Sequence, residues 1–79
     1  MRRTSLDVTV DILQAARKGA NKTRIVYQSN LNFEIVKGYL NGLIGSGMLS
    51  VNERGGYVTT SKGAKFIDDY HSLLKPLNH

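Results

Sequence analysis

Residues 32–63 constrain the fold of this chain more than any other stretch. From Asn32 to about Ser46, apolar side chains recur at helical spacing, and the pattern closes on Gly47, a residue type suited to the left-handed end of a helix. Residues 48–51 and 57–59 are typical of short strands, with a glycine-containing turn between them. The stretch therefore predicts a helix followed by a two-stranded hairpin.

Further helical patterns flank this stretch. Residues 5–18 and 22–29 predict two helices before it, and residues 61–75 predict a C-terminal helix that ends before Pro76. Each predicted helix follows a short polar residue that can cap it, namely Thr4, Asn21, Asn32 and Thr60. The order predicts an α+β fold, a winged helix-turn-helix: three helices, a two-stranded β-hairpin wing and a C-terminal helix.

Length and composition limit how such a fold is stabilised. The chain has 79 residues, enough for one domain (1–79) with a modest core. It has no cysteine, which excludes disulfides, and only two histidines, which makes a structural metal site close to excluded. An idealised core or a partner subunit remains as the supplement.

The net charge of +5 is unevenly distributed along the chain. Residues 20–65 carry six basic and two acidic side chains, whereas residues 66–79 carry one basic and two acidic ones. The basic excess therefore falls on the predicted helix-turn-helix and hairpin. This distribution favours a polyanionic partner, although a protein that is merely basic would show it too.

Several of these residues resemble a known family. The run 22–27 (KTRIVY), together with Tyr39, Leu43, Tyr57 and the segment 60–63 (TSKG), is similar to archaeal winged helix-turn-helix DNA-binding proteins, among them the small dimeric DNA-binding proteins of the Sulfolobales. The resemblance covers about residues 6–74. It implies binding of double-stranded DNA by a homodimer whose last helices pair. The chain departs from the family at Thr59, where leucine is usual, and at Pro76, which would keep a paired rod short.

The candidate DNA contacts lie on three elements. The outward side of the third helix and the positions flanking it would face bases in the major groove, where asparagine can read adenine and lysine can reach guanine or a phosphate. The start of the second helix suits a phosphate, and the hairpin tip suits the DNA backbone. The predicted residues are Asn32, Lys37, Gly38 and Asn41 on the third helix, Lys22, Thr23 and Arg24 on the second, and Arg54 and Gly55 on the wing.

Alternatives to this interpretation remain open at each position. Lys37, Asn41 and Arg54 are also ordinary solvent-facing residues, and Tyr27 is expected at the rim of the core rather than on DNA. Gly38 and Gly42 indicate either close approach of a partner or a weak helix. Since phosphate-type candidates outnumber base readers, we expect salt-dependent binding with modest sequence preference.

The C-terminal helix has more apolar surface than one small domain needs. One apolar row can cover the domain's own core, and a second would be exposed in a monomer. We therefore expect a homodimer through this helix, with an interface drawn from Phe66, Ile67, Tyr70, Leu73 and Leu74.

Other function classes find little support. Asp68 and Asp69 are adjacent and point to different sides of a helix, and His71 has no spaced partner, so no enzyme, cofactor or small-molecule substrate is expected. No apolar run reaches the length of a membrane span or a signal peptide, which predicts a cytoplasmic, nucleoid-associated protein. The competing hypothesis is a winged helix that binds another protein rather than DNA.

Overall fold

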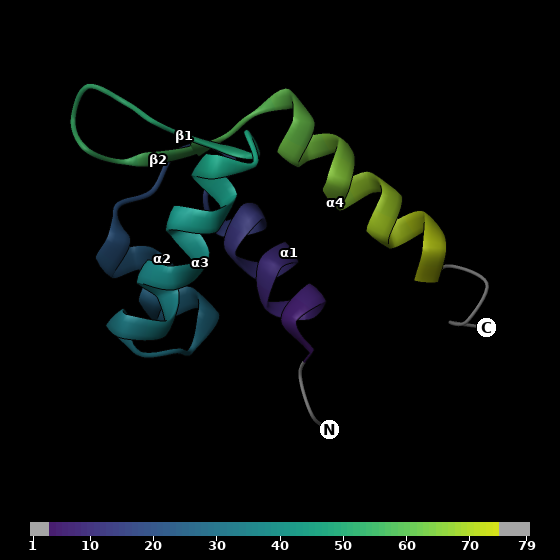
Figure 1. Ribbon diagram of the computed structural model, residues 1–79, viewed down its shortest axis with the longest axis horizontal. Coiled ribbons are helices and arrows are strands. Elements are labelled where there is room, and N and C mark those ends of the chain that lie inside the picture. The colour runs from purple at the N-terminus through teal and green to yellow at the C-terminus, as the bar shows by residue number, and fades with distance from the viewer. Residues whose placement is uncertain (1–3, 75–79) are drawn as a thin grey trace.

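The structure, a computed structural model, describes residues 4–74 as four helices and one two-stranded antiparallel sheet (Figure 1). The elements in chain order are α1 (Ser5–Ala15), α2 (Lys22–Ser29), α3 (Phe33–Gly45), β1 (Leu49–Val51), β2 (Tyr57–Thr59) and α4 (Ser61–Leu74). This arrangement confirms the predicted α+β winged helix-turn-helix fold. The basic residues Arg2 and Arg3, and the helix end predicted before Pro76, lie outside the described residues.

The predicted caps form as the sequence indicates. Thr4 and Asp7 make a reciprocal capping box at the start of α1. The Asn21 and Asn32 side chains accept the backbone N–H groups of Arg24 and Ile35, each at 2.8 Å. Each cap satisfies a backbone donor that the first turn of a helix leaves without a partner, and so fixes where the helix begins.

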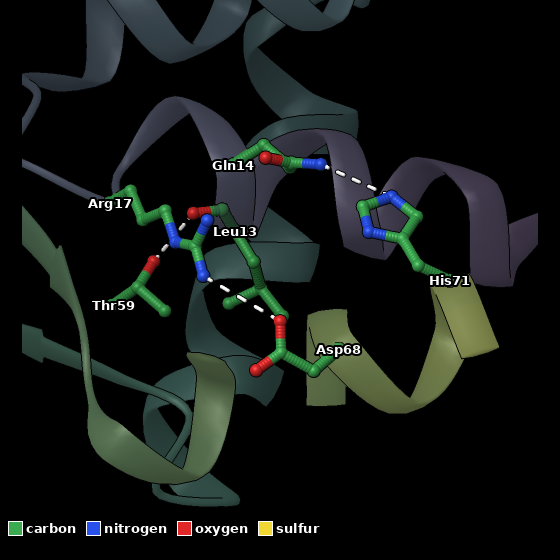
Figure 2. Close-up of polar contacts among 6 residues, drawn as sticks. All are labelled: Leu13, Gln14, Arg17, Thr59, Asp68 and His71. Atoms are coloured by element: carbon green, nitrogen blue, oxygen red, sulfur yellow. Dashed lines mark hydrogen bonds and ion pairs between the residues drawn. The ribbon is translucent and has the colours of Figure 1, made fainter. Parts of the chain in front are cut away.

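Helix α1 ends at Ala15, three residues earlier than predicted, because β2 binds one carbonyl group in its last turn and one on the residue that follows it. The Thr59 hydroxyl donates to the Leu13 carbonyl at 2.6 Å (Figure 2), and the Thr59 N–H donates to the Ala16 carbonyl at 3.0 Å. A leucine at position 59 could make only the second of these bonds. The threonine that departs from the family pattern thus ties the sheet to the end of α1.

The sheet has a small third component that the sequence did not reveal. Ala20, in the loop between α1 and α2, pairs with Tyr57 through two backbone hydrogen bonds of 2.8 and 2.9 Å. Gly19, with φ +92°, provides the left-handed turn that brings the chain to this position. The pairing holds the α1–α2 loop beside the base of the wing.

The core lies where α1, α2, α3 and α4 meet. The largest fully buried apolar side chains come from all four helices and are Ile12, Leu13, Ile25, Val36, Leu40 and Ile67. Helix α4 packs on α1, and polar pairs border this contact: Arg17 with Asp68 at 3.8 Å and Gln14 with His71 at 3.5 Å (Figure 2). In Figure 1, α4 lies on one side of α1, and α2 and the wing loop lie on the other.

Three large apolar or aromatic side chains are exposed. Tyr27, expected at the core rim, is 85% exposed because α2 turns Ile25 and Ser29 inward and leaves Tyr27 on the opposite side. Phe33 is 50% exposed because it stands at the first position of α3, beyond the reach of the core. Ile44 is 37% exposed near the other end of the same helix.

Candidate nucleic-acid interface

The outer face of α3 is nearly bare backbone. An added Cβ at Gly38, Gly42 or Gly45 would meet no neighbouring atom within 4 Å. Lys37 and Asn41 are exposed beside this row, on the side of the helix that also carries Phe33. A ligand could therefore approach the helix backbone closely here, with one cation and one amide at the edge of the contact.

The side chains at the start of α2 do not form one cluster, because they lie toward two different elements. The Lys22 ammonium lies 5.7 Å from the centre of the Phe33 ring, toward α3. Arg24, two residues later, instead lines a hollow with Arg17 and Lys18 at the end of α1. Thr23 is exposed between these two directions. The structure thus places the predicted phosphate contacts of α2 on two neighbouring surfaces.

The wing tip is organised by Asn52, a residue that sequence reasoning missed. Its side-chain oxygen accepts the backbone N–H groups of Arg54 and Gly56, each at 2.9 Å, and Gly55 takes a positive φ of +77° to complete the turn. Arg54 is exposed at this tip. The signal was present in the sequence, since asparagine often begins such side-chain turns.

Asn32 is a weaker base-reading candidate than predicted. Its side-chain oxygen already accepts the N–H of Ile35, so a bidentate contact with adenine, which needs both ends of the amide, would have to share this oxygen with the helix cap. Asn41 forms no hydrogen bond through its side chain within residues 4–74, and both ends of its amide are available.

Pairing divides the cations of the described chain into two groups. Toward α4, Arg17 pairs with Asp68, Lys65 pairs with Asp69 at 3.2 Å, and Lys62 donates to the Ser46 carbonyl at 2.7 Å. On the other elements, no cation forms an ion pair with a carboxylate of residues 4–74; these five are Lys18, Lys22, Arg24, Lys37 and Arg54, hereafter the unpaired cations. Unpaired positive charge is thus concentrated on the helix-turn-helix and the wing.

A shallow groove of about 510 Å³ runs between the start of α1 and α3. Its lining is largely apolar and includes Ile35, Tyr39, Gly38 and Gly42, with Glu34 as its charged member. The Tyr39 hydroxyl bonds to the Ser5 hydroxyl at 3.2 Å and closes one side of it. This groove repels phosphate at Glu34 and offers apolar contact instead, so it differs in character from the Lys37 side of the helix.

The predicted dimer face is partly wrong. Ile67 is fully buried in the chain's own core and cannot contact a second subunit, because α4 uses that row to pack on α1. The Tyr70 hydroxyl is also engaged, since it donates to the Asp7 carboxylate of the same chain. Leu73 is 68% exposed, and it lines an apolar groove of about 230 Å³ with Phe66 and Leu6, a residue of α1 that sequence reasoning missed.

The sequence and the fold of this chain were compared with those of known proteins. A family model for the winged helix-turn-helix matches residues 2–77. The chain belongs to the winged helix-turn-helix family. No curated protein matches it in sequence. Among solved structures, the crystal structure of Sso10a-2, a DNA-binding protein from Sulfolobus solfataricus, is similar to this winged helix-turn-helix chain at 24% identity with a TM-score of 0.81, over 92% of this chain and 80% of that one.

The described part of this winged helix-turn-helix chain contains neither a metal-binding group of side chains nor a membrane-spanning helix. Residues 4–74 contain no group of three or more histidine, cysteine or acidic side chains placed to hold a metal ion. No helix among them is both long enough and apolar enough to cross a membrane.

Proposed function

We propose that this protein binds duplex DNA as a low-specificity chromatin component or transcription regulator in the cytoplasm. The observation that carries the proposal is the placement of the unpaired cations on α2, α3, the wing and the loop beside it. Cations with no protein partner can replace the counterions of phosphate groups without first breaking an ion pair. The likeness in fold to Sso10a-2, a DNA-binding protein, supports the same partner.

In the proposed complex, the outer face of α3 enters the major groove. The bare backbone at Gly38 and Gly42 permits close approach, and Asn41 and Lys37 supply the polar contacts to base edges or phosphates. With so few long polar side chains on this face, the protein has little to read bases with. Binding is then dominated by phosphate contacts and shows modest sequence preference.

We further propose a homodimer through α4, with Phe66, Leu73 and Leu6 as its apolar contacts. These side chains, together with Asp69, line a largely apolar groove that the described chain leaves open to solvent. Tyr70 borders the groove, and Leu74 is partly exposed at the end of the helix. Pairing two copies would cover this surface and add apolar burial that a small domain needs.

A second candidate is a winged helix that binds another protein. The groove between α1 and α3 favours it, because its apolar lining and the exposed Ile35 suit a protein partner better than a phosphate. The two functions differ in whether they need the unpaired cations. Duplex binding requires the unpaired cations, whereas an apolar groove contact does not.

A gel-shift titration on random duplex DNA tests the proposal. Neutralising Arg24, Lys37 and Arg54 together, each by glutamine, should abolish duplex binding at low salt and leave the dimer intact. The matched control is Lys65→Gln, because Lys65 lies on α4 in a pair with Asp69 and should tolerate the change. Unchanged binding by the triple variant would refute DNA binding through this surface and favour the protein-binding candidate.

A further inference from the structure

A hollow of about 330 Å³ separates the wing loop from the loop between α1 and α2. Its two walls come from segments far apart in sequence: Lys18, Gly19 and Asn21 on one side, and Asn52 and Arg54 on the other. The Ala20–Tyr57 pairing holds the two walls together at the base. The hollow is therefore a fixed feature of the fold rather than a gap between two independent loops.

The polar groups lining the hollow are mostly donors. The side-chain oxygen of Asn52 accepts two backbone N–H groups, so this amide has its NH₂ group left to offer, and the side-chain oxygen of Asn21 accepts one. The backbone carbonyls of Ala20 and Gly56 accept the N–H groups of Tyr57 and Asn52, each at 2.8 Å. Each of these acceptors thus already binds at least one N–H group of the chain, and the two amide NH₂ groups are the donors left for a negatively charged ligand.

The charged residues around the hollow are both positive. Lys18 and Arg54 line its two walls, and neither forms an ion pair with a carboxylate of residues 4–74. The nearest acid in sequence, Glu53, does not line this hollow; it lines an adjoining one on the wing with Val51, Asn52 and Arg54. A site with two cations, two amide NH₂ groups and no carboxylate suits an oxyanion.

We propose that this hollow seats one phosphodiester group of the DNA backbone, held jointly by Lys18 and Arg54 and by the NH₂ group of Asn52. This seat rests on the proposed function, because a phosphate of the DNA strand beside the wing can occupy it only if the protein binds DNA. It also gives the α1–α2 loop a role in binding. A phosphate held between the wing and this loop would fix how deeply α3 sits in the neighbouring groove.

Salt titrations of charge variants test the seat. We expect Lys18→Gln and Arg54→Gln each to weaken binding to random duplex DNA about fivefold at low salt. The double variant should lower the slope of log affinity against log salt by about 0.9, the value for one phosphate. Lys65→Gln, which removes the same charge from α4, should leave both quantities unchanged.

An Asn52→Asp variant tests the hollow without removing a cation. Aspartate keeps an oxygen to accept the N–H groups of Arg54 and Gly56, so the loop and the melting temperature should be retained. It replaces the NH₂ donor with a second carboxylate oxygen, and we expect binding to weaken at least as much as in Lys18→Gln. Binding as tight as that of the wild type would show that no phosphate sits there.

The remaining outcomes separate this proposal from the proposed function. If the double variant lowers the slope by about twice the single-phosphate value, the two cations hold separate phosphates and the shared seat is refuted. If Lys37→Gln weakens binding while Lys18→Gln and Arg54→Gln bind like the wild type, the seat is refuted and DNA binding stands.

If Lys65→Gln weakens binding as much as Lys18→Gln and Arg54→Gln do, the losses follow from net charge and the seat is refuted. A wild-type protein that binds no duplex at low salt would overturn both.

Discussion

At the scale of single residues, the glycines of this chain differ in whether the fold requires them. A Cβ on Gly63 would lie 2.4 Å from the Met48 carbonyl oxygen and 2.7 Å from Thr59 Cγ2, so α4 can leave the sheet only with glycine there. At Gly38 the same atom would enter open space. The first glycine is required by packing, and the second is not required by the fold.

This contrast predicts opposite effects of the same substitution. Gly63→Ala should lower the free energy of unfolding by about 2 kcal/mol, because backbone must move to relieve the overlap. Gly38→Ala should raise it by about 0.5–1 kcal/mol, since alanine is the better helix former and meets nothing. Urea unfolding of both variants measures the difference, and equal effects would contradict the close approach of Gly63 to Met48 and Thr59.

The hydroxyl of Tyr70 gives a second residue-scale prediction. Its hydrogen bond to the Asp7 carboxylate, with smaller contributions from burial and from the negative charges of Asp7 and Asp11, raises the pKa of Tyr70 above the ordinary 10.0. A raised pKa means that the folded state favours the protonated phenol. The stabilisation is therefore complete below about pH 10 and is lost as the pH rises through the raised pKa.

Comparing the wild type with Tyr70→Phe isolates this effect. The wild type should be the more stable protein at neutral pH, and its advantage should shrink above about pH 10. Urea unfolding at a series of pH values gives the difference directly. An advantage that stays constant into strong alkali would mean that Tyr70 and Asp7 are not bonded in solution.

At the scale of elements, the sequence predicted what local patterns determine. The bounds of α2 and β2, the caps at Thr4, Asn21 and Asn32, and the left-handed end of α3 at Gly47 follow from short-range rules. The early end of α1 could not be predicted, because it depends on Thr59, 46 residues from Leu13 along the chain. Pairing between distant segments leaves no periodic signal.

The face of α3 makes a prediction for the element as a whole. Gly38→Leu should leave the fold intact, since the position opens to solvent, but a leucine side chain there should hold the helix away from DNA. We expect about a tenfold loss of duplex affinity by fluorescence polarisation. Gly45→Leu, near the far end of the same helix, is the matched control and should cost less. If Gly38→Leu binds as tightly as wild type, α3 does not enter the groove by this face.

The candidate site was harder to predict than the fold because it is assembled from four separate segments. Lys37, Asn41 and Arg54 are exposed as expected, which the helical period and the turn already implied. The position of Lys18 could not be predicted in this way, because Lys18 lies beside the wing only as a result of the Ala20–Tyr57 pairing. Ile67 was misplaced because periodicity shows two apolar rows on α4 but not which of them meets α1.

At the scale of the whole molecule, the two ends of the domain differ in chemistry. The side with the wing, α2 and α3 carries the unpaired cations, and the side with α4 carries the ion pairs Arg17–Asp68 and Lys65–Asp69 and the apolar groove at Leu73. In the proposed dimer, this separation would leave the proposed DNA surface uncovered.

The dimer makes its own prediction. Leu73→Glu should place a charge in the apolar groove and yield a monomer at tens of micromolar by sedimentation, with the fold retained because Leu73 is 68% exposed. Ser72→Glu adds the same charge on a different side of α4 and should remain a dimer. A wild type that sediments as a monomer would contradict the dimer, whatever the variants do.

The central claim, that this winged helix-turn-helix protein holds duplex DNA through phosphate contacts, is tested most directly by the salt dependence of wild-type binding. Titration of random duplex DNA over a series of salt concentrations should give a straight line of log affinity against log salt. With five unpaired cations available, the slope should lie between about −2 and −4.5 per protomer. A slope near zero, or no binding at low salt, would contradict the claim.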